Sequence, residues 1–291
     1  MKYSKEQISA MSKVQIKREL TLSGYKFTSL LAQPDANPKI KKGLKFGVMT
    51  FVMHLAESRK SGFNVCADAS DACIKMCLGE SGNPVYKTNK DSARIARTQA
   101  YFNARPLFLE LLRREIIAAI NYAKRKNYIP AFRLNGTSDI RFESVYLPMQ
   151  RVSIIEYIIC NGGECYDYTK GINRHTRKTF PKQYGLTYSW AGDNEAKCIE
   201  AFTTGLNIAI PFSTKRNKDL PKYFQLGTIR IPIFDGDNKH GDYRLKDPKR
   251  SIVGLRLKYQ TGPKAIPQKQ QLQLAIDSGF CIDALNDARA I

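Results

Sequence analysis

The sequence predicts an α/β protein built as a parallel, partial TIM-like barrel with a basic N-terminal extension. Short strand-like apolar runs alternate with helix-like runs over most of the 291 residues, a pattern typical of parallel sheets. The strands are apolar along their length, as in sheets that are covered on both faces. Polar residues follow almost every strand, at the edge where parallel barrels and open sheets build their active sites.

The expected elements follow from apolar periodicity and from capping residues. Apolar residues recur at helical spacing over residues 107–126, behind Pro106, and Asp91 or Ser92 can cap the helix before it. The predicted helices are 6–20, 92–103, 107–126, 152–159 and 194–203, and the predicted strands are 46–55, 130–135, 164–169, 185–190, 207–212, 229–234 and 251–257. We expect residues 1–42 to form the basic extension and residues 43–291 a single barrel-like domain.

The charge of the chain is strongly unbalanced. Lys and Arg number 47 and Asp and Glu 26, which gives a net charge of +21. Such an excess favours polyanions, so we expect nucleic acid or a nucleotide as partner. No apolar stretch approaches the ~20 residues that span a bilayer, and the N-terminus lacks the apolar core of a signal peptide. We therefore expect a cytoplasmic protein that has no membrane partner.

Three of the seven cysteines, Cys66, Cys73 and Cys77, fall within one short polar segment directly after the strand 46–55. Thiolates gathered at this density are typical ligands of soft metals and of iron–sulfur clusters. Gly79 and Gly82 follow and would let backbone approach such a cluster closely. The segment would lie on the same sheet edge as the polar strand ends. We therefore predict these three cysteines as metal ligands.

An iron–sulfur cluster is the interpretation we favour, because such clusters are held by Cys thiolates in short loops. We expect a 4Fe–4S cluster, in which three protein ligands leave one iron position open, with a 3Fe–4S cluster as the alternative. A structural zinc site is the alternative, and its fourth ligand would come from Cys160, Cys165, Cys198 or a histidine. Buried thiols without a metal are the third interpretation. The remaining cysteines fit the role of small buried hydrophobes.

Polar side chains at the predicted strand ends are candidates for binding a ligand. Arg94 and Arg97 share one face of the helix after the cysteine segment and could pair with a carboxylate or phosphate. The other candidates are Asn135, Thr137, Asp139, Asp167, Tyr168, Lys170, Asp235 and Asp237. Turn formation and solvated charges are the structural alternatives for these residues. No catalytic residue is assigned.

Two basic loops are candidates for contacting nucleic acid. They carry Arg174, Arg177, Lys178, Lys215 and Arg216. On the strand prediction, both loops share the edge of the cysteine segment, with aromatic residues nearby that could stack on bases.

A three-cysteine loop after the first strand of an α/β barrel resembles the radical S-adenosylmethionine enzymes. There the open iron binds the cofactor, so the resemblance adds S-adenosylmethionine as a candidate ligand. Those enzymes space their cysteines as Cys-x3-Cys-x2-Cys, whereas this chain has Cys-x6-Cys-x3-Cys.

A second resemblance, to the gene product 88 family of phage proteins, covers roughly residues 45–257. The matching segments keep their order and are residues 61–73, 77–82, 93–98, 133–140, 166–170 and 234–237. The resemblance implies a phage-encoded protein that acts in the host cytoplasm, and it implies no particular activity.

Two functions are consistent with these features. The first is an iron–sulfur enzyme with a radical S-adenosylmethionine-like barrel that acts on nucleic acid or a nucleotide. The second is a non-enzymatic nucleic-acid-binding protein in which an iron–sulfur or zinc site is structural.

Overall fold

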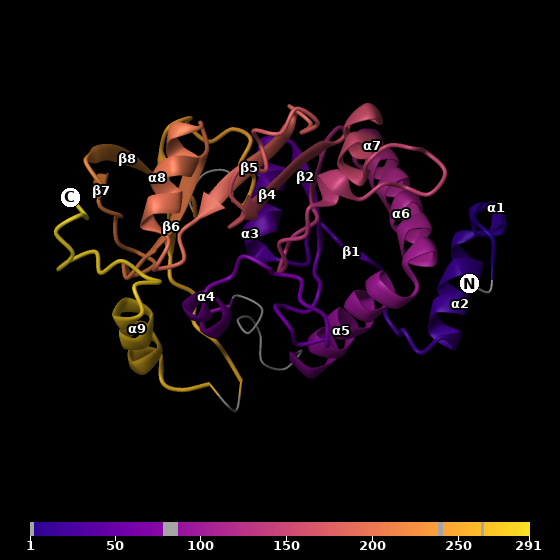
Figure 1. Ribbon diagram of the computed structural model, residues 1–291, viewed down its shortest axis with the longest axis horizontal. Coiled ribbons are helices and arrows are strands. Elements are labelled where there is room, and N and C mark those ends of the chain that lie inside the picture. Colours follow the sequence, from indigo (N-terminus) through magenta and orange to yellow (C-terminus); the bar gives the residue numbers. More distant parts are fainter. Residues whose placement is uncertain (1–2, 78–86, 238–240, 263–264) are drawn as a thin grey trace. The chain divides into compact units, whose positions relative to one another are not determined.

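The computed structural model describes residues 3–77, 87–237, 241–262 and 265–291 (Figure 1). The chain divides into two compact units, each made of separate stretches of sequence. Unit 1 comprises Met1–Ala67, Thr88–Cys165 and Pro181–Tyr184, and unit 2 comprises Asp68–Lys87, Tyr166–Phe180 and Gly185–Ile291. The predicted extension, residues 1–42, is therefore part of unit 1. None of the described helices is both long and apolar enough to cross a membrane.

Unit 1 begins with two short helices, α1 (Lys5–Ala10) and α2 (Lys13–Leu22). The single helix predicted over residues 6–20 is wrong, because Ser12 starts a new helix. Its hydroxyl accepts a hydrogen bond from the Gln15 N–H, and the Gln15 side chain accepts one from the Ser12 N–H. Both helices pack against α6 (Arg105–Arg125) (Figure 1).

The other helices of unit 1 cover and connect its strands. They are α3 (Pro38–Lys41), α5 (Lys87–Asn103), α7 (Ile154–Cys160) and the 3-10 turns η1 (Lys42–Phe46) and η4 (Phe142–Ser144). Helix α6 buries a continuous apolar face, and it packs on α7. Ser153 begins α7 with a capping box to Glu156. The helices predicted over 107–126 and 152–159 are confirmed within two residues at each end. The helix predicted over 92–103 exists, but α5 begins at Lys87, so the prediction that Asp91 or Ser92 caps it is wrong; the Ser92 hydroxyl donates to the Thr88 carbonyl inside the helix.

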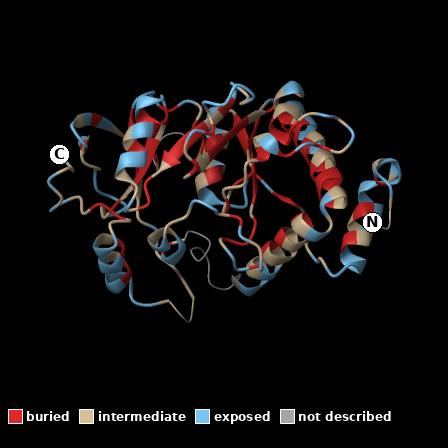
Figure 2. Cartoon of the chain, viewed as in Figure 1, coloured by how far each residue is buried: buried red, intermediate tan, exposed pale blue. Residues whose placement is uncertain are grey.

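The strands of unit 1 are β1 (Leu31–Ala32), β2 (Val48–Met53), β3 (Ile129–Arg133) and the start of β4 (Glu164–Thr169). Every residue of β2 is buried (Figure 2), as expected of a parallel strand covered on both faces. β2 pairs in parallel with β3, and β3 with β4, whereas β1 runs antiparallel along β2.

Unit 2 contains α4 (Asp71–Lys75), α8 (Glu195–Thr203) and α9 (Gln268–Asp277). Its strands are β5 (Tyr184–Ser189), β6 (Asn207–Phe212), β7 (Tyr223–Leu226), β8 (Ile229–Asp235) and β9 (Ile252–Arg256). β6 lies in parallel between β5 and β9, and β9 pairs in parallel with β8. β7 and β8 form an antiparallel hairpin, and neither β7 nor α9 was predicted.

The strands form one sheet in the order β1-β2-β3-β4-β5-β6-β9-β8-β7. The predicted α/β class with a mostly parallel sheet is confirmed. A barrel is not, because the described sheet is open. Its β7 edge is occupied by the C-terminal residues: Tyr223 and Ile291 exchange both backbone hydrogen bonds, and Gln225 N–H donates to the Arg289 carbonyl. The backbone groups that a closing strand would need on β7 are therefore already used.

Candidate metal and ligand site

Cys66 lies in unit 1, at the carboxyl ends of two parallel strands. Its sulfur is 3.9 Å from the Thr137 carbonyl, in the loop after β3. The Thr137 hydroxyl donates to the Leu55 carbonyl, just after β2, at 2.6 Å. The Asp139 N–H donates to the Val65 carbonyl at 2.8 Å, which fixes the backbone next to Cys66. Cys66 is half-buried in this loop cluster.

Cys73 and Cys77 lie in unit 2, on and directly after α4. The hydroxyl of Ser70 caps this helix by accepting a hydrogen bond from the Cys73 N–H at 3.1 Å. The same hydroxyl donates to the carbonyl of Ala191 at 3.0 Å, and Ala191 follows β5. This half of the cysteine segment is therefore also held at the carboxyl end of a parallel strand.

The C-terminal part of the chain supports α4 from a second side. Met76 packs in an apolar cluster with Ala275 and Cys281. The side chain of Gln260 donates a hydrogen bond to the Lys75 carbonyl. Cys73 and Cys77, about one helical turn apart, are both half-buried on this supported segment.

The structure describes Cys66 and the Cys73–Cys77 pair in separate units. Within the described residues, no three Cys, His, Asp or Glu side chains are grouped so that they could hold a metal ion. Gly79 and Gly82, which we expected beside a cluster, lie outside the described residues. The three-cysteine cluster therefore stays a prediction from the sequence.

The other four cysteines are less suited to holding a metal. Burial, followed by the negative charge of Glu195, raises the pKa of Cys198 to about 12. Burial, followed by the charge of Asp283, raises the pKa of Cys281 to about 12. Cys165 is buried within β4, and Cys160 is exposed at the end of α7. Since a thiolate is the metal ligand, Cys198 is a poor source for the fourth ligand of a zinc site.

Arg94 is buried and Arg97 half-buried, and both make contacts within unit 1. The Arg94 guanidinium lies 3.8 Å from Glu57 Oε2, and Glu57 and Asp91 each lie 2.9 Å from Lys60 Nζ. Arg97 donates to the Ser29 carbonyl at 2.8 Å and to the His54 carbonyl at 3.3 Å.

Burial, reinforced by the charge of Arg94, lowers the pKa of Arg97 to about 10. The observed contacts give Arg97 a structural role, because it ties the backbone before β1 to the end of β2.

Asn135 organises the turn after β3. Its Oδ1 accepts hydrogen bonds from the Ile140 N–H and the Ser138 hydroxyl, and its Nδ2 donates to the Ile140 carbonyl. This is the turn-forming role that we kept as the alternative to ligand binding. The turn lies so close to β2 that a Cβ on Gly136 would sit 2.4 Å from His54 Nδ1 and 2.7 Å from the Met53 carbonyl. Asp139 and Thr137 are half-buried beside it.

In unit 2, the end of β4 presents Asp167, which is 1% exposed, followed by the half-buried Tyr168 and Lys170. The Tyr188 hydroxyl, from β5, donates to the Lys170 carbonyl at 3.1 Å. The end of β4 thus carries a buried carboxylate and two half-buried polar side chains, which is suitable for ligand binding.

Asp235 and Asp237, at the end of β8, are both engaged by Arg256. The Arg256 guanidinium lies 2.9 Å from Asp235 Oδ1, and the Arg256 N–H donates to Asp237 Oδ2 at 2.8 Å. The Asp237 N–H also bonds to Asp235 Oδ1. The two aspartates therefore link the end of β8 to Arg256 of β9, which is a structural role of the kind expected for a polar turn.

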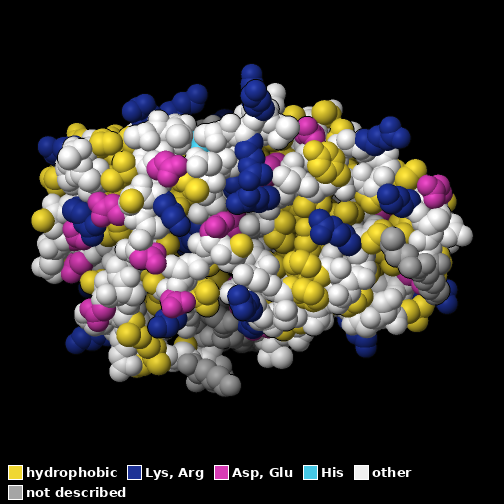
Figure 3. Space-filling model, in the orientation of Figure 1, with side chains coloured by type: hydrophobic (Ala, Val, Ile, Leu, Met, Phe, Trp, Pro, Cys, Tyr) yellow, Lys and Arg dark blue, Asp and Glu magenta, His cyan; other side chains and the backbone are white. Residues whose placement is uncertain are grey.

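The two basic loops differ in how they present their charges. Arg174 is 1% exposed and donates to the Thr169 hydroxyl at 3.0 Å, so it stabilises its own loop instead of facing solvent. Arg177, Lys178, Lys215 and Arg216 are exposed, as nucleic-acid contacts must be. On the face drawn in Figure 3, Lys and Arg side chains are scattered over the surface.

Arg244 and Glu115 are among the buried charged groups that sequence reasoning did not single out. Arg244 lies 3.1 Å from Asp247 inside unit 2 and donates to the Gly236 carbonyl. Glu115 lies on α6 among buried apolar residues and is itself 5% exposed. The sequence contained a signal for Glu115, because its position falls on the apolar face of the helix predicted over 107–126. A carboxylate on such a face is buried and therefore needs hydrogen-bond or ionic partners.

Comparison with known proteins identifies one family. Residues 28–284 match the family described as gene product 88, which is the family indicated by the motifs. No curated protein and no solved structure matches the chain.

Proposed function

We propose that this chain, which belongs to the gene product 88 family of phage proteins, is an iron–sulfur enzyme. Its cluster would be held by Cys66, Cys73 and Cys77. One observation carries the proposal. Both parts of the cysteine segment lie beside loops at the carboxyl ends of parallel strands, each within its own unit. In unit 1 Cys66 contacts Thr137, and in unit 2 Ser70, which caps the helix of Cys73, bonds to Ala191. Active sites of parallel α/β proteins are built at that edge.

The donor set fits a cluster. The three thiols are half-buried in polar surroundings, whereas Cys198 and Cys281 hold their protons firmly because they are buried. Bound by three thiolates, a 4Fe–4S cluster would offer its fourth iron to a small ligand and exchange single electrons, with a 3Fe–4S cluster as the alternative.

The strand order supports a relation to the radical S-adenosylmethionine barrels. The strands β2, β3, β4, β5 and β6 are neighbours in chain order, as in a (β/α) barrel, and the cysteine segment follows β2. S-adenosylmethionine is accordingly the candidate ligand of the open iron. The large positive charge supports nucleic acid or a nucleotide as the substrate class, in the host cytoplasm.

The decisive experiment is iron, sulfide and zinc analysis of anaerobically purified protein, together with its visible absorption and electron paramagnetic resonance spectra. We expect iron and sulfide in equal amounts and loss of both in the Cys73→Ala variant. Cys160→Ala is the matched control, because Cys160 is exposed and outside the segment. Colourless protein without iron would refute the proposal, and stoichiometric zinc would support the structural zinc site instead.

A nucleic-acid-binding protein with a structural metal site is the second candidate. It is favoured by the exposed Arg177, Lys178, Lys215 and Arg216 on two loops of unit 2. Binding through these cations should weaken with salt, with a slope that falls by about 0.9 for each phosphate contact removed.

The Cys73→Ser variant distinguishes the two candidates. If the protein is an enzyme, the variant should lose activity and keep most of its affinity for DNA or RNA. If the metal site is structural, the variant should lose its fold and its nucleic-acid binding together. Replacing Arg177 and Lys178 by Ala should reduce the salt slope in either case. An unchanged slope would exclude this loop from the nucleic-acid interface.

A further inference from the structure

The helix that carries Cys73 is too short to be stable by itself. α4 has five residues, and isolated helices shorter than roughly 12–15 residues are marginal in water. Its first turn is held by the hydroxyl of Ser70. The last carbonyl groups of a helix have no partner inside the helix. The last turn of α4 therefore depends on partners from other parts of unit 2.

Gln260, in the segment after β9, supplies a partner for this last turn. Its Nε2 donates a hydrogen bond to the Lys75 carbonyl, and Lys75 lies midway between Cys73 and Cys77. The contact joins distant parts of the chain, since Gln260 and Lys75 are 185 positions apart. A side chain can fix the backbone of two cysteines in this way when its own position is fixed by neighbours.

Gln271 of α9 fixes the position of Gln260. Its Oε1 accepts a hydrogen bond from the Gln260 N–H at 2.7 Å, and its Nε2 donates to the Gln260 carbonyl at 3.2 Å. The same Nε2 donates to the Ile266 carbonyl at 2.7 Å, so the oxygen and the nitrogen of this amide are both engaged. Gln271 is 3% exposed, and a buried group that loses such a bond is left unsatisfied.

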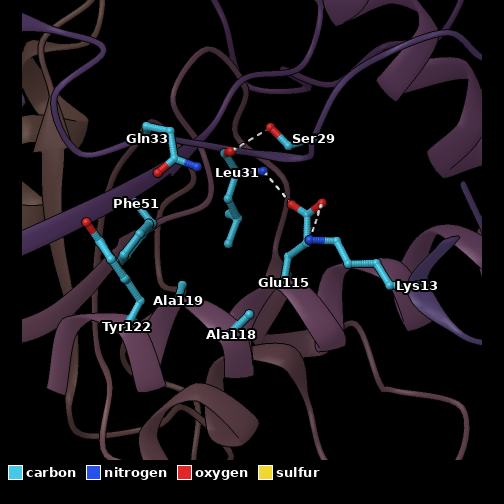
Figure 4. A pocket seen from close by; sticks show the side chains of 9 residues that line it. All are labelled: Lys13, Ser29, Leu31, Gln33, Phe51, Glu115, Ala118, Ala119 and Tyr122. Atoms are coloured by element: carbon cyan, nitrogen blue, oxygen red, sulfur yellow. Dashed lines mark hydrogen bonds and ion pairs between the residues drawn. The ribbon is translucent and has the colours of Figure 1, made fainter. Parts of the chain in front are cut away.

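An amide suits this role because it donates and accepts at once. The carboxylate of Glu115 in unit 1 shows the difference (Figure 4). It accepts hydrogen bonds from the N–H groups of Leu31 and of the residue before it, but the Leu31 carbonyl receives its hydrogen bond from the Ser29 hydroxyl. Gln271 instead satisfies the N–H and the carbonyl of one residue, as a neighbouring antiparallel strand does. It therefore replaces a strand partner for Gln260.

We propose that Gln260 and Gln271 are positioning residues for Cys73 and Cys77, so that α9 regulates how readily this part of the cysteine segment opens and releases a metal. The contacts run from α9 through Gln271 and Gln260 to the last turn of α4, within unit 2. The inference rests on the proposed function as far as the metal is concerned, whereas the effect on the two thiols needs no metal.

The test is thiol labelling of protein freed of metal by a chelator, with mass spectrometry to follow each cysteine. Gln260→Met removes the hydrogen bond to Lys75 and keeps a side chain of similar length. A hydrogen bond changes an equilibrium by about fivefold, so the labelling rates of Cys73 and Cys77 should rise by about that factor. Gln271→Met should raise both rates by no more than this, because Gln271 acts through Gln260. The double variant should match Gln260→Met alone.

Two controls separate positioning from a general loss of stability. Cys198, buried on α8, reports the opening of unit 2 as a whole, and its labelling rate should not change. Gln273→Met is the matched variant, because Gln273 is exposed on α9 and donates to Asp277, and it should leave every labelling rate unchanged. Circular dichroism and the melting temperature (Tm) verify that each variant folds.

Gln260→Lys tests the hydrogen bond itself. A lysine keeps a donor for the Lys75 carbonyl, and a cation is favourable at the end of a helix. It should restore the native labelling rates, which a loss of packing alone would not allow. Unchanged labelling of Cys73 in Gln260→Met would overturn the proposal. An equal rise for Cys198, or a double variant in which the two effects multiply, would also overturn it.

Iron-loaded protein gives a second readout, the rate at which iron passes to the chelator bathophenanthroline. This rate should rise by about fivefold in Gln260→Met, because release needs the same opening, and it should be unchanged in Gln273→Met. Equal rates for the native protein and Gln260→Met would overturn the regulation by α9. If the native protein holds no iron but the labelling results are as expected, the iron–sulfur proposal fails and the positioning role stands.

Discussion

Ser70 controls how firmly the Cys73–Cys77 segment is held, and its replacement by Ala gives a quantitative prediction. The substitution removes the cap on the Cys73 N–H and the hydrogen bond to the Ala191 carbonyl. An N-cap contributes about 1 kcal/mol and a hydrogen bond about another 1 kcal/mol, so local opening of α4 becomes easier by about 2 kcal/mol. Since 1.4 kcal/mol is tenfold, the open population should rise by about 25-fold.

Thiol labelling with mass spectrometry measures this population for each cysteine. Under conditions where opening precedes reaction, the labelling rates of Cys73 and Cys77 should rise by about the same factor in Ser70→Ala. Ser12→Ala removes an equivalent cap, on α2 of unit 1, and should leave both rates unchanged. Equal rates for the native protein and Ser70→Ala would refute the role of this hydroxyl.

Three further predictions concern groups outside the cysteine segment. Burial raises the pKa values of Cys198 and Cys281 to about 12, so both thiols should resist iodoacetamide up to about pH 10, whereas the exposed Cys160 should react. Alkylation of Cys198 as fast as that of Cys160 would contradict this. Gly136→Ala should destabilise the protein by about 1–3 kcal/mol, because its Cβ would overlap His54 and the Met53 carbonyl, and an unchanged Tm would show that the turn moves freely. Hydrogen bonds from Arg289 lower the pKa of Asp287 from its ordinary 3.8. The ionised Asp287 carboxylate therefore stabilises the folded state above about pH 4, and this contribution is lost as the pH falls further. Trp190, whose ring lies 5.5 Å from the Arg289 guanidinium, should report the loss by fluorescence, and Asp287→Asn should mimic it at neutral pH.

The parallel core was predictable because a strand that is buried on both faces has an apolar sequence along most of its length. Val48–Met53 and Ile252–Arg256 are apolar runs of strand length, and the structure pairs both in parallel. Two local features were also recorded but overlooked. The repeated Ser-x-x-Gln of residues 4–7 and 12–15 marks two helix starts, and Gly227 marks the two-residue turn between β7 and β8.

Other features depend on partners that are distant in sequence. Glu115 receives hydrogen bonds from residues 84 and 85 positions away, which no local pattern can indicate. The burial of Arg174 was missed for a different reason, because its basic loop resembles a solvated surface in the sequence although the guanidinium donates to Thr169 within the same loop. Strand order again depends on distant partners, since β9 inserts beside β6 and leaves β8 outside.

The pairing of residues 289–291 with β7 has a consequence for self-association. Exposed strand edges are templates for pairing with other chains, and proteins protect themselves by covering them. Here the cover is a short peptide, anchored by Arg289 to Asp287 and Glu195 and preceded by Leu285, which is 92% exposed. Cleavage at Leu285 would therefore remove the cover and leave the hairpin open to a second molecule. Light scattering after limited proteolysis would reveal such association, and a nicked protein that stays monodisperse would show that the edge is protected in another way.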